Sequence, residues 1–318
     1  MGGILVVGSI NMDVVIRVKH HPVPGETVRG FETAYHPGGK GANQAVAASR
    51  AGSFVRVFGA VGNDSFGETL QSALLNDDID TQFVRMIDKP SGVALITVSE
   101  DGENTIIVAG GANEQLREQD LMDADGNGLW DGIDTLLVQN EISPDVTRLA
   151  MRRAHELGIH VVFNASPVAG ITVDWIKHVD TLVVNETEAQ TLADQPVMTV
   201  DEAKQAISRL LHTGPKSVIV TLGAQGAVFG SWKTDDDGEI GQGIHVVSQS
   251  AFDVPVVDTT AAGDTFVGAL AAVRSACSDT SKALRFAAAA SGLAVTKMGA
   301  QSSIPTRRDV EMFLAERK

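Results

Sequence analysis

From residue 56 onward, the chain alternates between short strand-like runs and helix-like segments. Apolar residues dominate the runs at 57–61, 135–138, 160–163, 181–184 and 217–222, and helix-like segments occupy 66–75, 145–157 and 200–212. Because parallel neighbours need a crossover between them, this alternation predicts a mostly parallel sheet with helices on both faces. We therefore expect an α/β protein with three layers, αβα, in a single domain over residues 1–318.

Polar residues follow several of the apolar runs. Asn11 follows the first strand-like run, 4–7, and Glu141, Asn185, Gly223 and Asp258 follow later ones. In an open α/β sheet, ligands collect at the carboxyl ends of the strands, so we expect these positions to form one site. The side chains of Asn11 and nearby Asp13 suit hydroxyl groups better than phosphate, although an Asx-turn would also explain them.

The stretch 254–266 combines an apolar run, a tight turn and the start of an Ala-rich helix. We interpret 254–257 as a strand, after which Ala261, Ala262 and Gly263 allow a bulky anion to approach the backbone. Asp264 then has two interpretations. It is either the N-terminal residue of an ordinary helix, or a carboxylate that takes the proton from a hydroxyl attacking a phosphoryl group.

Two other parts of the chain contain strand patterns without intervening helices. They include 14–18 and 25–35 in the first part, and 92–98 and 104–108 in the second, joined by a turn at 99–103. We expect insertions at about 13–37 and 92–110 to form a small antiparallel β-sheet lid. Its apolar face must cover the active site, a partner subunit, or both.

The composition argues against some kinds of partner and cellular location. A net charge of −15 argues against a nucleic-acid or anionic-membrane surface, since phosphate contacts need clustered Lys and Arg. The single Cys277 cannot form an internal disulfide, and the start of the chain has no basic segment followed by a long apolar run. We expect a cytoplasmic protein.

Two local patterns resemble known metal sites without matching them. The segment 123–134 fits a calcium loop on paper, but it stands alone and ends in Asp134, so a chance acidic turn is our interpretation. His20, His21 and His36 lack metal-ligand spacing. We also interpret 235–238 as a solvated hairpin turn.

The glycine-rich segment 38–45 runs into an Ala-rich helix that ends near residue 50. It is not a P-loop, because Lys40 is followed by Gly41 rather than Ser or Thr. Lys40 and Asn43 instead offer hydrogen-bond donors to a polyol. No G-x-G-x-x-G follows the first strand, which disfavours a dinucleotide-dependent oxidoreductase.

Three segments together resemble the PfkB family of sugar kinases. They are Gly38-Gly39-Lys40-Gly41-Ala42-Asn43-Gln44-Ala45, Asn185-Glu186-Thr187-Glu188 and Asp258-Thr259-Thr260-Ala261-Ala262-Gly263-Asp264-Thr265-Phe266. Together with Gly8-Ser9-Ile10-Asn11-Met12-Asp13, the first segment most resembles the branch that phosphorylates free ribose. The resemblance extends from the first strand to 299–303, which is essentially the whole chain.

The resemblance implies a set of binding residues. The sugar would contact Asn11, Met12, Asp13, Gly39, Lys40, Gly41, Ala42, Asn43, Glu141 and Asp264. ATP would lie against Asn185, Thr221, Leu222, Gly223, Ala224, Gln225, Gly226, Gly263 and Asp264. Glu188 matches the position that organises Mg²⁺ through water, and a K⁺ ion would lie near Asp258, Thr260, Ala294, Lys297, Gly299 and Ser303.

The resemblance also implies the reaction. ATP would phosphorylate the terminal 5-hydroxyl of D-ribose, with Asp264 as the general base and the turn Ala261, Ala262 and Gly263 as the anion hole. The lid would form a homodimer contact. The alternatives are a kinase of the same family for fructose, deoxyribose or a nucleoside, and a non-catalytic sugar- or nucleotide-binding regulator.

Overall fold

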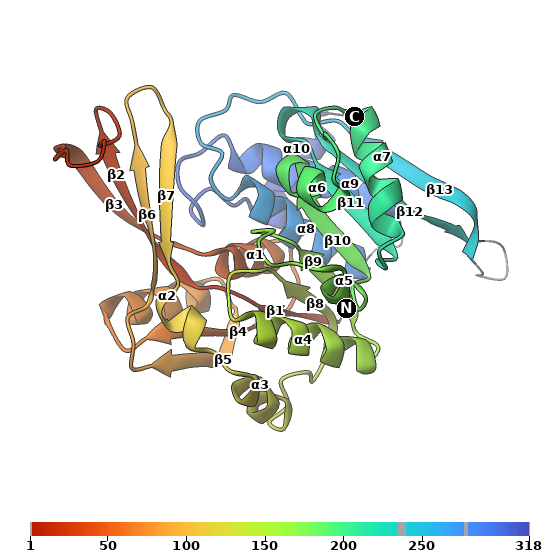
Figure 1. Cartoon of the computed structure of the whole chain (residues 1–318), viewed down its shortest axis with the longest axis horizontal. Coiled ribbons are helices and arrows are strands. Elements are labelled where there is room, and N and C mark those ends of the chain that lie inside the picture. The colour runs from red at the N-terminus through yellow and green to blue at the C-terminus, as the bar shows by residue number, and fades with distance from the viewer. Residues whose placement is uncertain (1, 235–239, 277–278, 318) are drawn as a thin grey trace.

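The computed structural model describes residues 2–234, 240–276 and 279–317, in which two sheets stand side by side (Figure 1). The larger sheet of this described part has nine strands in the order β13 (Ile240–Gln249), β12 (Ala227–Thr234), β11 (Ser217–Thr221), β10 (Thr181–Asn185), β9 (His160–Asn164), β8 (Ile133–Val138), β1 (Gly3–Val7), β4 (Val55–Gly62) and β5 (Asp80–Ile87). Every pair from β11 to β5 is parallel, while β11–β12 and β12–β13 are antiparallel. The predicted, mostly parallel sheet is confirmed.

Alternation along each central strand divides the core into two clusters. In β1, Ile4 and Val6 belong to one cluster, and Leu5 and Val7 belong to the other. All four side chains are fully buried. Successive residues of a strand point to opposite faces, so a strand that is apolar throughout needs cover on both sides.

Helices supply that cover and complete the three layers. One face carries α1 (Lys40–Arg50), α2 (Ser65–Asn76), α8 (Ala262–Ala276), α9 (Thr280–Ala294) and α10 (Arg307–Ala315). The other face carries α3 (Glu118–Asp125), α4 (Pro144–Glu156), α5 (Val173–Ile176), α6 (Glu186–Ala193) and α7 (Val200–Leu211), with the 3₁₀ turn η1 (Gly111–Gln115). A second 3₁₀ turn, η2 (Gly223–Gln225), follows β11.

The smaller sheet contains the four strands that the sequence assigned to a lid. Its order is β3 (Gly30–Gly38), β2 (Asn11–Val18), β6 (Gly92–Val98) and β7 (Asn104–Ala109). The outer pairs β2–β3 and β6–β7 are antiparallel, whereas the central pair β2–β6 is parallel. The sheet projects to one side of the three-layer body (Figure 1).

Helices α1 and α8 pack closely beneath the sheet. A Cβ atom added at Gly268 of α8 would lie 2.4 Å from the backbone oxygen of Gln44 and 2.7 Å from Cβ of Ala47, both in α1. Real Cβ atoms do not approach a carbonyl oxygen this closely, so the absence of a side chain at Gly268 sets the distance between the two helices.

One predicted strand is wrong. Residues 254–257 run without regular structure, and the side chains of Val256 and Val257 are largely exposed. Pro255 has no backbone N–H, and the N–H groups of Val257 and Asp258 both bond to the carbonyl oxygen of Val295, at 2.8 and 3.2 Å. The segment is therefore tied to the end of α9 rather than to the sheet.

The sequence patterns that resembled metal sites have ordinary structural explanations. Asp123 and Asp125 lie within α3, and Asp125 Oδ2 accepts a 2.7 Å hydrogen bond from Nε of Arg153. His20 pairs with Glu26 at 3.0 Å. Across the described ranges, no three His, Cys, Asp or Glu side chains are arranged to hold a metal ion.

Two sequence predictions concern residues outside the described part of the chain. They are the turn at 235–238 and the thiol of Cys277. The flanking strands β12 and β13 do pair as an antiparallel hairpin. In the residues that the structure describes, no helix is both long and apolar enough to cross a membrane.

We predict that Gly268→Ala destabilises the protein by about 1–3 kcal/mol, because the new methyl group overpacks the contact between α1 and α8. Urea unfolding of the variant and the wild type measures the difference. Gly292→Ala in α9 is the matched control: its added Cβ would meet nothing nearer than 3.7 Å. The control should be neutral or stabilising by up to about 1 kcal/mol. Equal losses in both variants would contradict the close contact at Gly268.

Candidate active site

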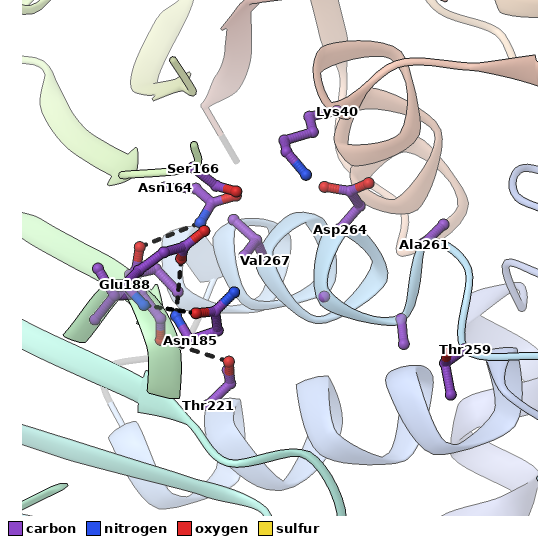
Figure 2. A pocket seen from close by; sticks show the side chains of 14 residues that line it. Lys40, Asn164, Ser166, Asn185, Glu188, Thr221, Thr259, Ala261, Asp264 and Val267 are labelled. Atoms are coloured by element: carbon purple, nitrogen blue, oxygen red, sulfur yellow. Dashed lines mark hydrogen bonds between the residues drawn. The ribbon is translucent and has the colours of Figure 1, made fainter. Parts of the chain in front are cut away.

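A pocket of about 230 Å³ lies where the carboxyl ends of β10 and β11 face the start of α8 (Figure 2). Its lining brings together predicted residues from distant parts of the sequence: Lys40, Asn185, Glu188, Thr221, Ala261, Ala262, Gly263 and Asp264. The remaining lining residues, which the sequence patterns did not indicate, are Asn164, Ser166, Val183, Val184, Thr259 and Val267. Of the five strand-end positions expected to form one site, Asn185 lines this cavity, whereas Asn11, Glu141, Gly223 and Asp258 do not.

The first turn of α8 has the features of an anion site. Ala261 has a left-handed φ of 58°, and the N–H of Ala262 bonds to the carbonyl of Thr259 at 3.2 Å. Within the described residues, no hydrogen bond uses the N–H of Gly263 or Asp264, and a Cβ added at Gly263 would meet nothing within 4 Å. Free N–H groups, a helix N-terminus and open space together suit a phosphate group.

The carboxylate of Asp264 is held by two amide groups from α1. Nδ2 of Asn43 donates to Oδ2 at 3.0 Å, and Nε2 of Gln44 donates to Oδ1 at 2.9 Å. Figure 2 shows the ammonium group of Lys40 and the carboxylate of Asp264 pointing toward one another. Because both carboxylate oxygens have a donor, the orientation of the group is fixed before any substrate binds.

Gln44 belongs to a buried network that sequence reasoning missed. Besides Asp264, its Nε2 donates to Oδ1 of Asn164 at 3.0 Å, and its Oε1 accepts from Nε2 of Gln139 at 2.7 Å. The side chains of Gln44 and Gln139 are fully buried. In the sequence, a glutamine among the small apolar residues of an Ala-rich helix is unusual. This pattern was the signal that could have marked Gln44 as a candidate.

A second group of polar residues surrounds the sugar-binding positions. Oε2 of Glu141 accepts from Oγ of Ser9 at 2.7 Å and from the backbone N–H of Lys40 at 3.3 Å. Nδ2 of Asn113 donates to Oδ1 of Asn11 at 2.8 Å. Ser9 and Asn113 were not predicted, because their contacts join residues more than 100 positions apart.

Asn43 has an acceptor that suits a polyhydroxy ligand. Its Oδ1 is buried and makes no hydrogen bond among the described residues. A hydroxyl group of a sugar can donate to this atom, and a buried acceptor without a donor is otherwise costly. The arrangement therefore fits the predicted polyol.

The charges at this end of the site are concentrated. Burial, together with the neighbouring carboxylates of Glu141 and Asp264, raises the pKa of Asp13 to about 7, against the lowering effect of Lys40. Burial would by itself lower the pKa of Lys40, but the surrounding carboxylates, first that of Asp264 and then that of Glu141, outweigh it and raise the pKa. Lys40 is therefore a protonated donor among several acids.

The end of β10 forms a capping box with the start of α6. Oδ1 of Asn185 accepts from the N–H of Glu188, and Oε2 of Glu188 accepts from the N–H of Asn185, both at 2.9 Å. The other carboxylate oxygen of Glu188 makes no hydrogen bond among the described residues. Glu188 is buried and lines the pocket, so its oxygen donor fits a hydrated Mg²⁺ ion.

The loop from β11 to β12 contains the other predicted nucleotide positions. Thr221 lines the pocket, and η2 begins at Gly223. Gln225, in contrast, donates to the backbone oxygen of Met198 at 2.8 Å, and the N–H of Leu222 closes the loop by bonding to the carbonyl of Gly226 at 2.7 Å. These residues shape the loop beside the pocket.

The predicted K⁺ residues lie around Asp258. Its Oδ1 accepts from the N–H and the hydroxyl of Thr260, at 2.9 and 2.6 Å, and its Oδ2 accepts from the N–H of Gly299 at 2.8 Å. Burial raises the pKa of Asp258, but these hydrogen bonds outweigh it and hold the pKa below its ordinary value. The other predicted K⁺ residues lie close to Gly299 in the sequence. The N–H of Lys297 bonds to the carbonyl of Ala294, and the side chain of Ser303 is buried. Asp258 therefore links Thr260 and Gly299, two of the positions that the resemblance assigned to K⁺.

Some predicted contact residues can reach a ligand only through their backbone. The side chains of Met12, Ala42 and Ala294 are buried, and those of Met12 and Ala42 pack in the core cluster that includes α1 and α8. A ligand would meet only their N–H or carbonyl groups.

Comparison with known proteins places this site in a family. The family model for pfkB family carbohydrate kinases matches residues 1–307. The chain belongs to the PfkB family of carbohydrate kinases. A ribokinase of Haemophilus influenzae is 38% identical over 312 residues, which cover 97% of each chain.

Solved structures agree with the PfkB assignment. The ribokinase of Thermotoga maritima has a TM-score of 0.86 and 35% identity, over 99% of this chain and 100% of the other. The Arabidopsis thaliana ribokinase, solved with ribose and ATP, has a TM-score of 0.85 and 30% identity over 98% of both chains. The predicted family and fold are thus confirmed, and the PfkB motifs correspond here to the start of α1, the β10–α6 junction and the start of α8.

The raised pKa of Asp13 predicts how stability depends on pH in this PfkB-family kinase. The folded protein holds the proton of Asp13 up to about pH 7, whereas the unfolded chain releases it near its ordinary value of 3.8. The contribution of Asp13 to the free energy of unfolding of the ligand-free protein should therefore fall between about pH 4 and pH 7, by a few kcal/mol. Asp13→Asn should remove this fall and be more stable than the wild type above about pH 7.

Urea unfolding across this pH range, without sugar or nucleotide, measures the effect. Glu100→Gln, which removes an exposed carboxyl group of the lid, is the control and should keep the wild-type pH dependence. An unchanged pH dependence in Asp13→Asn would contradict the raised pKa.

Proposed function

We propose that the protein transfers the γ-phosphoryl group of ATP to the terminal 5-hydroxyl of D-ribose, giving ribose 5-phosphate. The observation that carries the proposal is the carboxylate of Asp264, which is fixed by two amide groups in the first turn of a helix whose free N–H groups face the same pocket. The similarity to ribokinases over nearly the whole chain supports ribose as the acceptor, and the Arabidopsis thaliana ribokinase was solved with both ribose and ATP.

The two substrates would occupy opposite sides of Asp264. The sugar would contact Asn11, Asp13, Gly39, Lys40, Asn43 and Glu141, with Met12, Gly41 and Ala42 contributing backbone groups. The nucleotide would extend from the start of α8 toward Asn185 and the loop Thr221–Gly226. The open space at Gly263, the lining of the pocket and the free Oδ1 of Asn43 support this division.

In the proposed mechanism, Asp264 accepts the proton of the sugar hydroxyl as its oxygen attacks the γ-phosphorus in line. The N–H groups of Gly263 and Asp264 donate to the oxygens that gain charge in the transition state, and the dipole of α8 adds to this. Asn43 and Gln44 keep the carboxylate oriented by donating to it. Lys40 balances the charge of the acids around the sugar.

Two ions complete the proposal. Glu188 would hold Mg²⁺ through water, and Asp258, Thr260, Ala294, Lys297, Gly299 and Ser303 would surround K⁺. Mg²⁺ would supply neutralising charge for the phosphates of ATP. On the protein side, Asp258 ties the residues before α8 to Gly299, which supports a role for this region in keeping the anion hole in shape.

We also propose a single domain over residues 1–318 and a homodimer formed through the lid sheet. The register places Val108 across Ala94 from Asp13, and Ile106 across Ile96 from Val15, so these residues share the face that carries Asp13. Ile106 and Val108 are each 54% exposed, and an exposed apolar strand needs cover.

A cytoplasmic location also remains a prediction.

We predict that Asp264→Asn lowers kcat by roughly 10²- to 10⁴-fold, because the amide cannot accept the hydroxyl proton. Ribose and ATP should still bind. A coupled assay of ADP release measures the rate with ribose, deoxyribose, fructose and a nucleoside, each with and without K⁺, and ribose with K⁺ should give the highest kcat/KM.

Asp253→Asn is the matched control, since Asp253 is an exposed carboxylate in the same segment. It should turn over as the wild type does. Wild-type rates in Asp264→Asn would exclude Asp264 as the base. If none of these acceptors stimulated ADP release by the wild type, the protein would not be a sugar kinase.

For the proposed dimer, we predict that Ile106→Glu yields monomers, because the new charge would be buried in the contact between lids. Sedimentation equilibrium of the wild type and the variant measures the mass. Met312→Glu in α10 places the same charge at a side chain with similar exposure, 55%, outside the lid, and should leave the mass unchanged. A wild-type monomer, or a variant that stays dimeric, would contradict the proposed interface.

A further inference from the structure

A second cavity, of about 310 Å³, lies at the opposite end of α8 from Asp264. It is lined by the first residues of β8, β9 and β10, among them Thr135, His160 and Thr181, and by Leu270 and Arg274 of α8. Asp264 and Arg274 are ten positions apart on one helix, which corresponds to about 15 Å along its axis. The cavity shares no lining residue with the active-site pocket.

Arg274 contributes an unpaired cation to this cavity. Its NH1 donates to Oγ1 of Thr181 at 3.2 Å, and its guanidinium lies 5.7 Å from the centre of the Phe229 ring. Within the part of the chain that the structure describes, no carboxylate forms an ion pair with it. Burial lowers the pKa of Arg274, against the raising effect of Asp180. Most of its five N–H donors are thus free for a planar, charged acceptor.

The nearest acid is already engaged by other groups. The carboxylate of Asp180 accepts from Nζ of Lys216 at 2.6 Å and from the N–H of Val161 at 2.8 Å. His160 cannot neutralise Arg274, because an imidazole is either neutral or positively charged. Burial lowers the pKa of this imidazole, with help from the charges of Arg274 and Lys216 and against those of Asp180 and Asp134. Among the described residues, the positive charge of Arg274 is thus available to a partner from outside the chain.

The other residues that line the cavity restrict the chemistry of the ligand. Val162, Leu270 and Ala271 provide apolar surface. Asp134 lies exposed at the cavity and accepts from Oγ1 of Thr135 at 2.9 Å. With Asp134 at the cavity, a ligand with two or more negative charges would be repelled more strongly than a single carboxylate, which matches the one guanidinium.

We propose that this cavity binds a small organic monocarboxylate, with its carboxylate forked on Arg274 and its short apolar body against Val162, Leu270 and Ala271. The site is independent of the proposed sugar phosphorylation. It resembles other ligand pockets in having apolar walls with one well-placed charged group.

Calorimetric titration of the full-length protein with sodium butyrate tests the proposal, with butyramide as the uncharged probe of the same shape. Butyrate should bind saturably and butyramide at least roughly tenfold more weakly, since the difference between them is the charge. Arg274→Met should weaken butyrate binding to a similar extent. Binding of butyrate should be the same in the presence of saturating ATP.

The proposal would be overturned if butyrate did not bind saturably or if the two probes bound equally well. Undiminished binding of butyrate to Arg274→Met, or displacement of butyrate by ATP, would also overturn it. Inorganic phosphate is a further probe, and binding of phosphate at Arg274 as tight as that of butyrate would exclude the monocarboxylate class. If Arg274→Met fails to fold, Arg274→Lys keeps the charge but loses the planar fork, and it should bind butyrate several-fold more weakly than the wild type. Unchanged affinity in Arg274→Lys would also overturn the proposal.

Discussion

The geometry of the active site depends on the contact between α1 and α8 at Gly268. Because Gly268 has no side chain, α8 lies directly against the backbone of Gln44. Asp264 is one turn earlier on α8, so its carboxylate reaches the amides of Asn43 and Gln44 on α1. Residues about 220 positions apart in the chain are brought within hydrogen-bond distance in this way. The same contact lets the first turn of α8 form one wall of the pocket while Lys40, at the start of α1, forms another.

The two halves of the site use different kinds of electrostatics. On the sugar side, Asp13, Glu141 and Asp264 surround Lys40. Burial and the neighbouring carboxylates raise the pKa of Asp13, and the carboxylates raise the pKa of Lys40 against the effect of burial. Such a cluster suits neutral hydroxyl groups, which both donate and accept. On the phosphate side, backbone N–H groups at a helix N-terminus take the place of a basic patch. This division explains how a chain with a net charge of −15 can offer a site for a phosphate ligand.

The sequence predicted the elements better than it predicted their neighbours. Alternating strands and helices were sufficient for the parallel sheet, and polar residues after the strands indicated the site. Ser9, Asn113 and Gln139 were missed because their roles come from hydrogen bonds to distant residues, which no local pattern encodes. The parallel pairing of β2 with β6 was missed for the same reason, because the paired residues lie about 80 positions apart in the chain. Residues 254–257 were misassigned because β-branched composition resembles a strand even where Pro255 prevents regular pairing.

The short connection between β1 and β2 ties the two sheets together at the sugar positions. Strand β1 ends at Val7, and β2 begins at Asn11 in the other sheet, so only three residues separate the central sheet from the lid. Asn11 and Asp13 are therefore the first side chains beyond this joint. A displacement of β2 relative to the central sheet would therefore move Asn11 and Asp13 relative to Lys40 and Asp264. If Asn11 and Asp13 contact the sugar as proposed, the connection between the two sheets and the sugar contacts are then neighbouring residues, and a change in one would be felt by the other.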